Sequence, residues 1–405
     1  MRQIYRFQGL HAESAGLLHQ RLASRRAIIM SELIPAQQNL PSSELQSSQV
    51  PIDFNQLRPD GLADLMSKGW LRGVHLENDP QIQAVMQRFL NEFRESEERY
   101  SPRTLLQLTC MWEQFAEWCV ENNEPYLPAK IETVKRYLSQ RARDKHRNTL
   151  LLDKWSISRN HRACGCPDPT TDQSVKDLMA ALIRTKVMAD ESIEQASAMR
   201  ECHIDELVQI WGGSEHLADR RDIAMLVVAY ESLLRSKELA NIRIKHLQVK
   251  SDGSGLLTIP ITKTNKSGEP DYVYLSRQAV RLIREYMSAA GRSLVVHPER
   301  PDEPLFGGLN RVGKSVKVIK VMTYTTIYKI FSRAWEALDL ESVGIPRFSA
   351  HSARVGAAQD LAANGYNSLQ IMMSGRWASE VMVGRYCRNI FAEEGAMAKM
   401  RHGRR

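Results

Sequence analysis

The stretch HSARVGAAQDLAANGYNSLQIMMSGRWASEVMVGRYCRN, residues 351–389, is the most informative part of this sequence. Ser349 precedes it as an expected N-cap, so His351 and Arg354, three residues apart, should share one face of a helix. Gly365 is expected to end that helix, because glycine readily adopts the left-handed conformation found after many helices. A glycine turn, a tryptophan and a tyrosine on a further short helix follow. The segment therefore predicts a helical C-terminal region that carries four side chains able to donate or accept protons or hydrogen bonds in a reaction.

These side chains share a possible chemistry. Trp377 lies 26 residues and Tyr386 lies 35 residues after His351. A tyrosine can attack a phosphodiester once its phenol, whose usual pKa is about 10, has lost a proton. Negative charge that grows on the phosphoryl oxygens must be met by donors and cations, and two guanidinium groups can supply them without a metal ion.

Three upstream residues complete such a set. Arg235 supplies a second guanidinium, and Glu238, one helical turn later, can orient Arg235 or His351. Lys263 stands at the shoulder of an expected β-hairpin, where it can protonate a leaving oxygen. Each residue alone has an ordinary explanation, such as core packing for Trp377 or a surface ion pair for Arg235 and Glu238. Their occurrence together and in this order favours chemistry on a phosphodiester.

The rest of the chain predicts a mainly α protein with two domains. Residues 1–78 are punctuated by Pro, Gly and Ser and are expected to form a poorly ordered extension with at most one short helix around residues 61–68. Asp-Pro and Ser-Pro helix starts, followed by apolar residues at helical spacing, predict an all-helical domain over 79–187. Residues 188–200 lack bulky apolar anchors and indicate a linker to a second domain over 201–405.

A small antiparallel β element is expected in the second domain. Residues 256–261 and 272–275 are β-type runs that flank a segment containing Asn, Ser and Gly. Two such runs around a turn predict a β-hairpin.

Composition narrows the class of protein. The chain carries 55 Lys and Arg against 47 Asp and Glu, and its net charge of +8 favours a polyanionic partner. No run of about eighteen uncharged apolar residues occurs, so no membrane partner is expected.

Six cysteines without a disulfide framework or zinc-ligand spacing predict a reducing cell interior and no metal site. The Arg-rich first thirty residues have the composition of a transit peptide, but a weakly ordered leader, or a start at Met30, is the preferred interpretation.

With these motifs in place, the sequence resembles a known family, the tyrosine site-specific recombinases. The resemblance spans roughly residues 79–400 and is strongest from 217 onward. Its motifs are AYESLLRSKELANIR at 229–243, TKT at 262–264, HSARVGAA at 351–358, GRW at 375–377, YCRN at 386–389 and EGAM at 394–397. It implies a helical core-binding domain over 79–187 and a tyrosine-recombinase catalytic domain over 201–405 that ends in an exchange helix at 390–401.

The resemblance also implies a role for each candidate residue. Tyr386 would be the nucleophile, forming a 3′-phosphotyrosyl bond and freeing a 5′ hydroxyl. His351 and Trp377 would donate to the transition state, and His351 can also take the phenolic proton. Arg235 and Arg354 would clamp the phosphate.

The remaining implied roles concern proton delivery and orientation. Lys263 would be the general acid, and Glu238 would be an accessory residue. No cofactor, ATP or metal would be required. Residues implied or suggested as DNA contacts are Arg141, Arg147, Lys154, Arg159, Arg243, Arg311 and Lys314.

The implied partner is double-stranded DNA with an inverted-repeat recombination site, bound by a homo-tetramer on two such sites. No small-molecule substrate is expected, and the location would be cytoplasmic, with the nucleoid in a prokaryote. One alternative is a catalytically silent DNA-binding relative with a regulatory or architectural role. Another is a type IB topoisomerase or hairpin telomere resolvase, which shares the cleavage chemistry. The target sequence, and whether the reaction resolves, inverts or integrates DNA, depends on base contacts and site placement.

Overall fold

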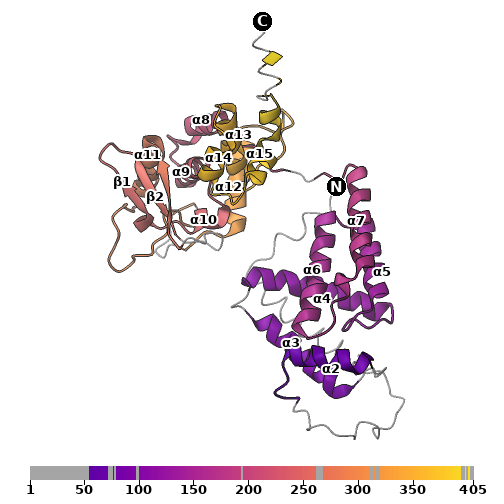
Figure 1. Ribbon diagram of the computed structural model, residues 1–405. Coiled ribbons are helices and arrows are strands. Elements are labelled where there is room, and N and C mark those ends of the chain that lie inside the picture. Colours follow the sequence, from indigo (N-terminus) through magenta and orange to yellow (C-terminus); the bar gives the residue numbers. More distant parts are fainter. Residues whose placement is uncertain are drawn as a thin grey trace. The chain divides into compact units, whose positions relative to one another are not determined.

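The computed structural model divides the chain into two compact units, which are described separately (Figure 1). We refer to residues 54–192 as the N-terminal unit and to residues 195–401 as the C-terminal unit. The described residues are 54–401 without 72–75, 77–78, 97–99, 193–194, 261–267, 311–312, 315–319, 394–396 and 398–399.

The N-terminal unit is helical. Its helices are α2 (Pro59–Leu71), α3 (Pro80–Glu95), α4 (Pro102–Glu121), α5 (Ile131–Asp144), α6 (Arg147–Ala163) and α7 (Gln173–Met188), with a 3-10 turn η3 (Pro169–Thr171). Two predicted starts are confirmed: Asp79 accepts a hydrogen bond from the backbone N–H of Gln81 at 2.7 Å, and Ser101 accepts one from Thr104 at 3.3 Å. The proline that follows each cap has no N–H to leave unpaired.

Helix α2 corrects the expected extent of the N-terminal extension. Leu62 and Met66 are fully buried and belong to the same core as Trp112, Phe115 and Tyr137. Residues from 59 to 71 are therefore part of the packed unit, because their apolar side chains at helical spacing find an aromatic core to cover. Residues 1–53 of the expected extension lie outside the described residues.

The C-terminal unit combines helices with one small sheet. Its helices are α8 (Glu201–Trp211), α9 (Leu217–Ser232), α10 (Ser236–Ala240), α11 (Arg277–Ala289), α12 (Tyr324–Ala337), α13 (Ser352–Ala363), α14 (Ser368–Gly375) and α15 (Glu380–Glu393), with a 3-10 turn η4 (Ile244–His246). The strands are β1 (Leu247–Val249), β2 (Gly255–Ile259) and β3 (Asp271–Leu275).

The sheet is antiparallel with the order β1-β2-β3, and Leu257 of β2 pairs with Val273 of β3. The predicted hairpin is confirmed, and β1 is an additional strand that the sequence did not indicate. The mainly α fold class with a small antiparallel β element is thus confirmed.

Helix α9 lies at the centre of this unit. All residues from 223 to 229 are buried, and the helix packs against α8, α11, α13 and β3. A helix that is apolar on every side needs neighbours on every side. The helix ends at Leu233, which has a left-handed φ of 49°. This end is one wall of the candidate site.

The last residues of the expected linker at 188–200 pack in the C-terminal unit. Met199 is fully buried, and its N–H donates to the carbonyl of Ser352 at 3.0 Å. Gly356 makes room for this segment, since a Cβ at that position would lie 1.8 Å from the Met199 oxygen.

Two further findings apply to the part of the chain that the structure describes. None of its helices is both long and apolar enough to cross a bilayer. No group of His, Cys, Asp and Glu side chains in it is arranged to hold a metal ion.

Candidate active site

The start of α13 differs from the expected one. His351 is the N-cap, with φ −103°, and the helix begins at Ser352 rather than after Ser349. The hydroxyl of Ser352 accepts from the Ser349 N–H at 2.9 Å, while the His351 N–H donates to the Ser349 hydroxyl at 3.3 Å. This local turn places His351 just outside the helix with an exposed edge, and Arg354 in the first turn with 3% exposure.

Arg354 joins two helix ends. Its guanidinium donates to the carbonyl oxygens of Leu233, after α9, and Gly375, at the end of α14. The carbon of the same guanidinium lies 4.5 Å from the centroid of the Trp377 ring. Carbonyls at helix C-termini carry partial negative charge, so they suit a buried cation. They are nevertheless neutral groups, and the charge of Arg354 stays uncompensated by them.

The turn before Trp377 is made by Arg376 and not by a glycine. Arg376 has the left-handed φ of 52°, whereas Gly375 is the last helical residue of α14. Gly375 is required for a different reason: a Cβ there would lie 2.3 Å from the Trp377 ring. The ring therefore packs flush on the helix end, 7% exposed, and its centroid lies 5.4 Å from that of Tyr386.

Tyr386 lies on α15, as predicted, and is anchored through its backbone. Its carbonyl accepts from the side chains of Gln359 at 3.1 Å and Gln195 at 3.3 Å. The next residue, Cys387, is buried and donates through its thiol to the carbonyl of Ala358 at 3.3 Å. These contacts fix α15 on α13. Gln195 and Gln359 were not predicted, because neither lies in a motif.

The Cys387 thiol stays protonated at neutral pH. Burial raises the pKa of Cys387 to about 11, and Arg200 lowers it by a smaller amount. A thiol is a poor nucleophile compared with its thiolate. Tyr386, the neighbouring residue on α15, is partly exposed.

Arg235 and Glu238 form a pair at the start of α10. Arg235 is the N-cap, and Glu238 accepts from its backbone N–H at 2.9 Å and from its guanidinium at 2.8 Å. Of the two partners expected for Glu238, the structure shows Arg235. The arginine side chain is 34% exposed and the glutamate 10% exposed, so the arginine keeps open N–H groups.

The cations of the site lower one another's pKa values. Burial, then Arg235 and Arg376, lower the pKa of Arg354 to about 10. The pKa of His351 is lowered by desolvation first and by Arg354 and Arg235 second, although the residue is exposed. An imidazole with a lowered pKa is neutral at pH 7 and can accept a proton.

The predicted catalytic residues thus converge from three segments of the C-terminal unit. Arg235 and Glu238 come from α10, His351 and Arg354 from the start of α13, and Trp377 and Tyr386 from the region of α14 and α15. Lys263 lies outside the described residues.

Two of the predicted DNA contacts in the N-terminal unit are used inside it. Arg141 makes a two-pronged contact with the fully buried carboxylate of Asp153, at 3.0 and 3.2 Å. Arg147 donates to the carbonyl of Glu191 at 2.7 Å. The first contact ties α5 to α6, and the second ties the start of α6 to the segment after α7. Charge-assisted hydrogen bonds of this kind are stronger than bonds between neutral groups.

The other predicted DNA contacts differ in exposure. Lys154 and Arg159 on α6 are partly exposed, as is Arg243 before η4, while Lys314 is exposed. Arg311 lies outside the described residues.

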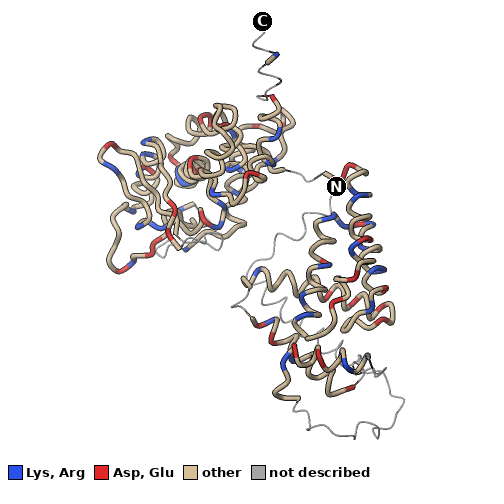
Figure 2. The backbone as a smooth tube through the Cα atoms, viewed as in Figure 1, with Lys and Arg blue, Asp and Glu red and all other residues tan. Residues whose placement is uncertain are grey.

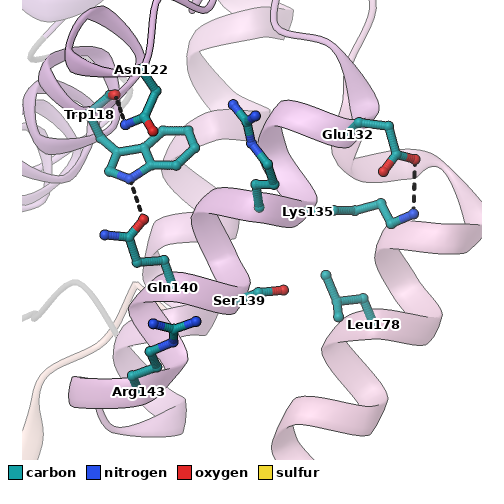
Figure 3. Close-up of a pocket in the computed structure, with 9 residues that line it drawn as sticks. Trp118, Asn122, Glu132, Lys135, Ser139, Gln140, Arg143 and Leu178 are labelled. Atoms are coloured by element: carbon teal, nitrogen blue, oxygen red, sulfur yellow. Dashed lines mark hydrogen bonds and ion pairs between the residues drawn. The ribbon is translucent and has the colours of Figure 1, made fainter.

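A hollow in the N-terminal unit is separate from these groups. It is lined by Trp118, Lys135, Gln140 and Arg143, among others, and the Trp118 indole donates to Gln140 at 2.8 Å (Figure 3). Along the helices of this unit, basic and acidic residues are interspersed (Figure 2). The hollow contains none of the predicted catalytic or DNA-contacting residues.

Comparison with known proteins agrees with this geometry. Residues 199–393 match the model of the phage integrase family. Over 328 residues, 80% of this chain and 94% of the relative, the sequence is 29% identical to the Cre recombinase of Escherichia phage P1. It is 25% identical over 343 residues to an integrase/recombinase XerD homologue of Selenomonas ruminantium, covering 82% of this chain and 93% of that protein.

A solved structure shows the same fold. The Tn1549 transposon integrase in complex with transposon right-end DNA superposes with a TM-score of 0.52 and 13% identity, covering 75% of this chain and 94% of that chain. The family match covers α8 to α15, the segment in which the predicted catalytic side chains converge. Residues 199–393 of this chain are therefore a domain of the phage integrase family, the tyrosine recombinases.

Proposed function

We propose that this protein is a site-specific DNA recombinase that cleaves and rejoins DNA through a 3′-phosphotyrosyl bond on Tyr386. One observation carries the proposal. Buried Arg354 lies against the ring of Trp377, and that ring contacts Tyr386. Arg235 is close enough to Arg354 to lower its pKa. Two guanidiniums and a tyrosine are the groups that metal-free attack on a phosphodiester needs.

The cleavage step follows from these positions. The Tyr386 oxygen bonds to phosphorus as the bond from phosphorus to the 5′ oxygen breaks, so the phosphate ends on the tyrosine and the 5′ end becomes a hydroxyl. His351, neutral at pH 7, accepts the phenolic proton. Arg235 and Arg354 bind the non-bridging oxygens, and Trp377 donates its N–H. Lys263, on the strength of the sequence resemblance, protonates the departing oxygen.

Rejoining reverses this step with a different 5′ hydroxyl. The phosphotyrosyl bond conserves the energy of the broken phosphodiester, so strand exchange requires neither ATP nor a metal ion. In this proposal, side chains rather than water meet the transition-state charge, which saves the cost of reorganising water.

The proposed partners, DNA and further copies of this chain, are supported by the relatives and by the charge and exposed side chains of this protein. The relatives include the Cre recombinase, and the Tn1549 integrase was solved with DNA. We propose that this protein binds double-stranded DNA at an inverted-repeat site as a tetramer, in the cytoplasm. Met397 and Met400 at the C-terminal end are 64% and 43% exposed, which suits docking of the terminal segment on a neighbouring protomer. The charge of +8 favours the polyanion.

The test is a nicked DNA substrate that carries the cognate site, sought as inverted repeats around a short spacer near the coding region. Loss of the short strand after cleavage traps the covalent intermediate. The wild-type protein should form a covalent adduct in EDTA, and Tyr386→Phe should bind the same DNA but form none. Binding by wild type without any adduct would favour the silent DNA-binding relative instead. Equal adduct from both proteins would exclude Tyr386 as the nucleophile.

A further inference from the structure

Arg376 is a residue that the catalytic scheme above does not use. It caps α14 with φ 52° and ψ 46°, in the left-handed region that glycine tolerates and a side chain with a Cβ does not favour. Arginine at such a position is unusual for backbone reasons alone. Its side chain should therefore do something that glycine cannot.

The Arg376 side chain turns into the candidate site. It is 12% exposed, and its guanidinium donates to the carbonyl of Ser232, at the end of α9, at 3.0 Å. The same nitrogen lies 3.9 Å from a carboxylate oxygen of Glu238. Glu238 is thus shared between Arg235 and Arg376. The carboxylate of Asp271, on β3, attracts Arg376 more weakly than Glu238 does.

The charge balance of this cluster is unusual for buried groups. Arg235, Glu238, Arg354 and Arg376 bring three guanidiniums and one carboxylate together, a net charge of +2 within this set, which Asp271 offsets only through its weaker attraction for Arg376. Burial and mutual repulsion lower the pKa values of Arg354 and Arg376. Buried like charges are unfavourable unless an anion completes them. The phosphorane formed when tyrosine attacks a phosphodiester carries two negative charges, which match the surplus.

We propose that Arg376 is a positioning residue for phosphoryl transfer: it holds Glu238, so that Arg235 can turn its N–H groups from Glu238 to the scissile phosphate. This inference rests on the proposed function. Without Arg376, Arg235 is the only cation bound to Glu238. Their charges then cancel, and Arg235 stays bound to the carboxylate instead of the phosphate. With Arg376, the carboxylate is held by a second cation while Arg235 binds the substrate.

The first test exploits the backbone conformation. Arg376→Gly relieves the left-handed strain, so the melting temperature should stay equal or rise by about 2–4 °C. The rate of covalent adduct formation should nevertheless fall roughly 10- to 100-fold, with DNA affinity changed little. Stability and activity then move in opposite directions, which a merely structural role cannot produce. The matched control is Asp339→Gly, which removes an exposed side chain at a φ of 48° and should leave cleavage unchanged.

The second test asks whether Arg376 acts through Glu238. In a Glu238→Gln background there is no carboxylate to hold, so Arg376→Gly should cost less than about 3-fold. Arg376→Lys, which keeps the charge, should retain most of the activity of the wild type and remains usable if the glycine variant fails to fold.

Two results would overturn the proposal: wild-type cleavage by Arg376→Gly, or equal losses in both backgrounds. Loss of activity in Arg376→Lys as large as in Arg376→Gly would do the same. Failure of the proposed function is distinct, since the wild-type protein would then form no adduct at all.

Discussion

Partly buried Arg141 in the N-terminal unit and buried Arg354 in the C-terminal unit show how differently the two units treat charge. Arg141 in the N-terminal unit has its two-pronged contact with Asp153, a full counter-charge with no exposed surface. Arg354 in the C-terminal unit donates only to neutral carbonyls and lies near further cations. The first pattern is that of a structural tie. The second leaves a surplus of positive charge that Glu238 offsets only in part, which is what an anion-binding catalytic site needs.

Of the two arginines compared, Arg354 should have the larger effect on cleavage when it is replaced. Arg354→Ala removes the buried guanidinium that contacts Trp377, and the rate of covalent cleavage should fall by about 10³-fold or more. Single-turnover cleavage of the nicked substrate measures this rate. Arg354→Lys should also be strongly impaired, because an ammonium cannot donate to Leu233 and Gly375 in the same fork. An Arg354→Ala variant whose cleavage rate stays within a few-fold of the wild-type rate would show that Arg354, like Arg141, has a structural role only.

Arg141→Ala should lower the stability of the protein and leave the rate of cleavage nearly unchanged. It leaves the buried Asp153 without its partner, so the N-terminal unit should lose about 3 kcal/mol of unfolding free energy. Chemical denaturation measures that loss. The folded fraction should form the phosphotyrosyl adduct at nearly the wild-type rate once bound to DNA. A large loss of cleavage at unchanged stability would instead show that Arg141 contacts the substrate.

A buried histidine sharpens the comparison further. His161 is fully buried, its Nε2 accepts from the Ala129 N–H at 2.9 Å, and its neutral ring therefore donates through Nδ1 to Ile157 at 2.8 Å. Burial lowers the pKa of His161 to about 4. As pH falls from 6.5 toward 4, the unfolded chain takes up a proton that the folded unit refuses, so stability declines.

The expected decline is on the order of 3 kcal/mol, because one pKa unit corresponds to about 1.4 kcal/mol. Denaturation of the protein at pH 7 and at pH 4 measures it. The corresponding difference for His161→Gln should be smaller by that amount. An identical pH dependence in both proteins would show that other groups cause the decline.

The smallest effect should come from the anchor of Tyr386. Gln359→Ala removes one neutral hydrogen bond to the Tyr386 carbonyl, so cleavage should slow by about 5-fold while DNA affinity and melting temperature barely change. Gln195→Ala, which removes the other bond to the same carbonyl, should behave alike. Rates measured at saturating DNA separate slower chemistry from weaker binding. Unchanged rates in both variants would show that packing alone positions α15.

Local signals predicted the elements, whereas tertiary contacts decided the details. The caps at Asp79 and Ser101 follow from their own side chains and were predicted. The start of α13 was not, because the helix begins after His351, which caps it without a side-chain hydrogen bond that the sequence could have signalled. Gly375 suggested a turn, yet its role is to let the Trp377 ring pack, which no sequence spacing reveals.

The candidate site was predicted by resemblance more than by periodicity. Nothing local links Arg235 to Arg354, more than a hundred residues later, and only the packing of α9 on α13 brings their segments together. Arg376 was missed because a left-handed arginine cannot be told from any other arginine in a sequence. Gln195 and Gln359 were missed because their bonds go to a backbone carbonyl.

The most direct measurement is the position of the covalent bond itself. The adduct trapped on the nicked substrate in EDTA would be digested with protease and nuclease, and the peptide carrying the nucleotide identified by mass spectrometry. The account predicts a peptide that contains Tyr386, linked to a 3′ phosphate. A nucleotide attached to any other residue, or attached through a 5′ phosphate, would contradict it.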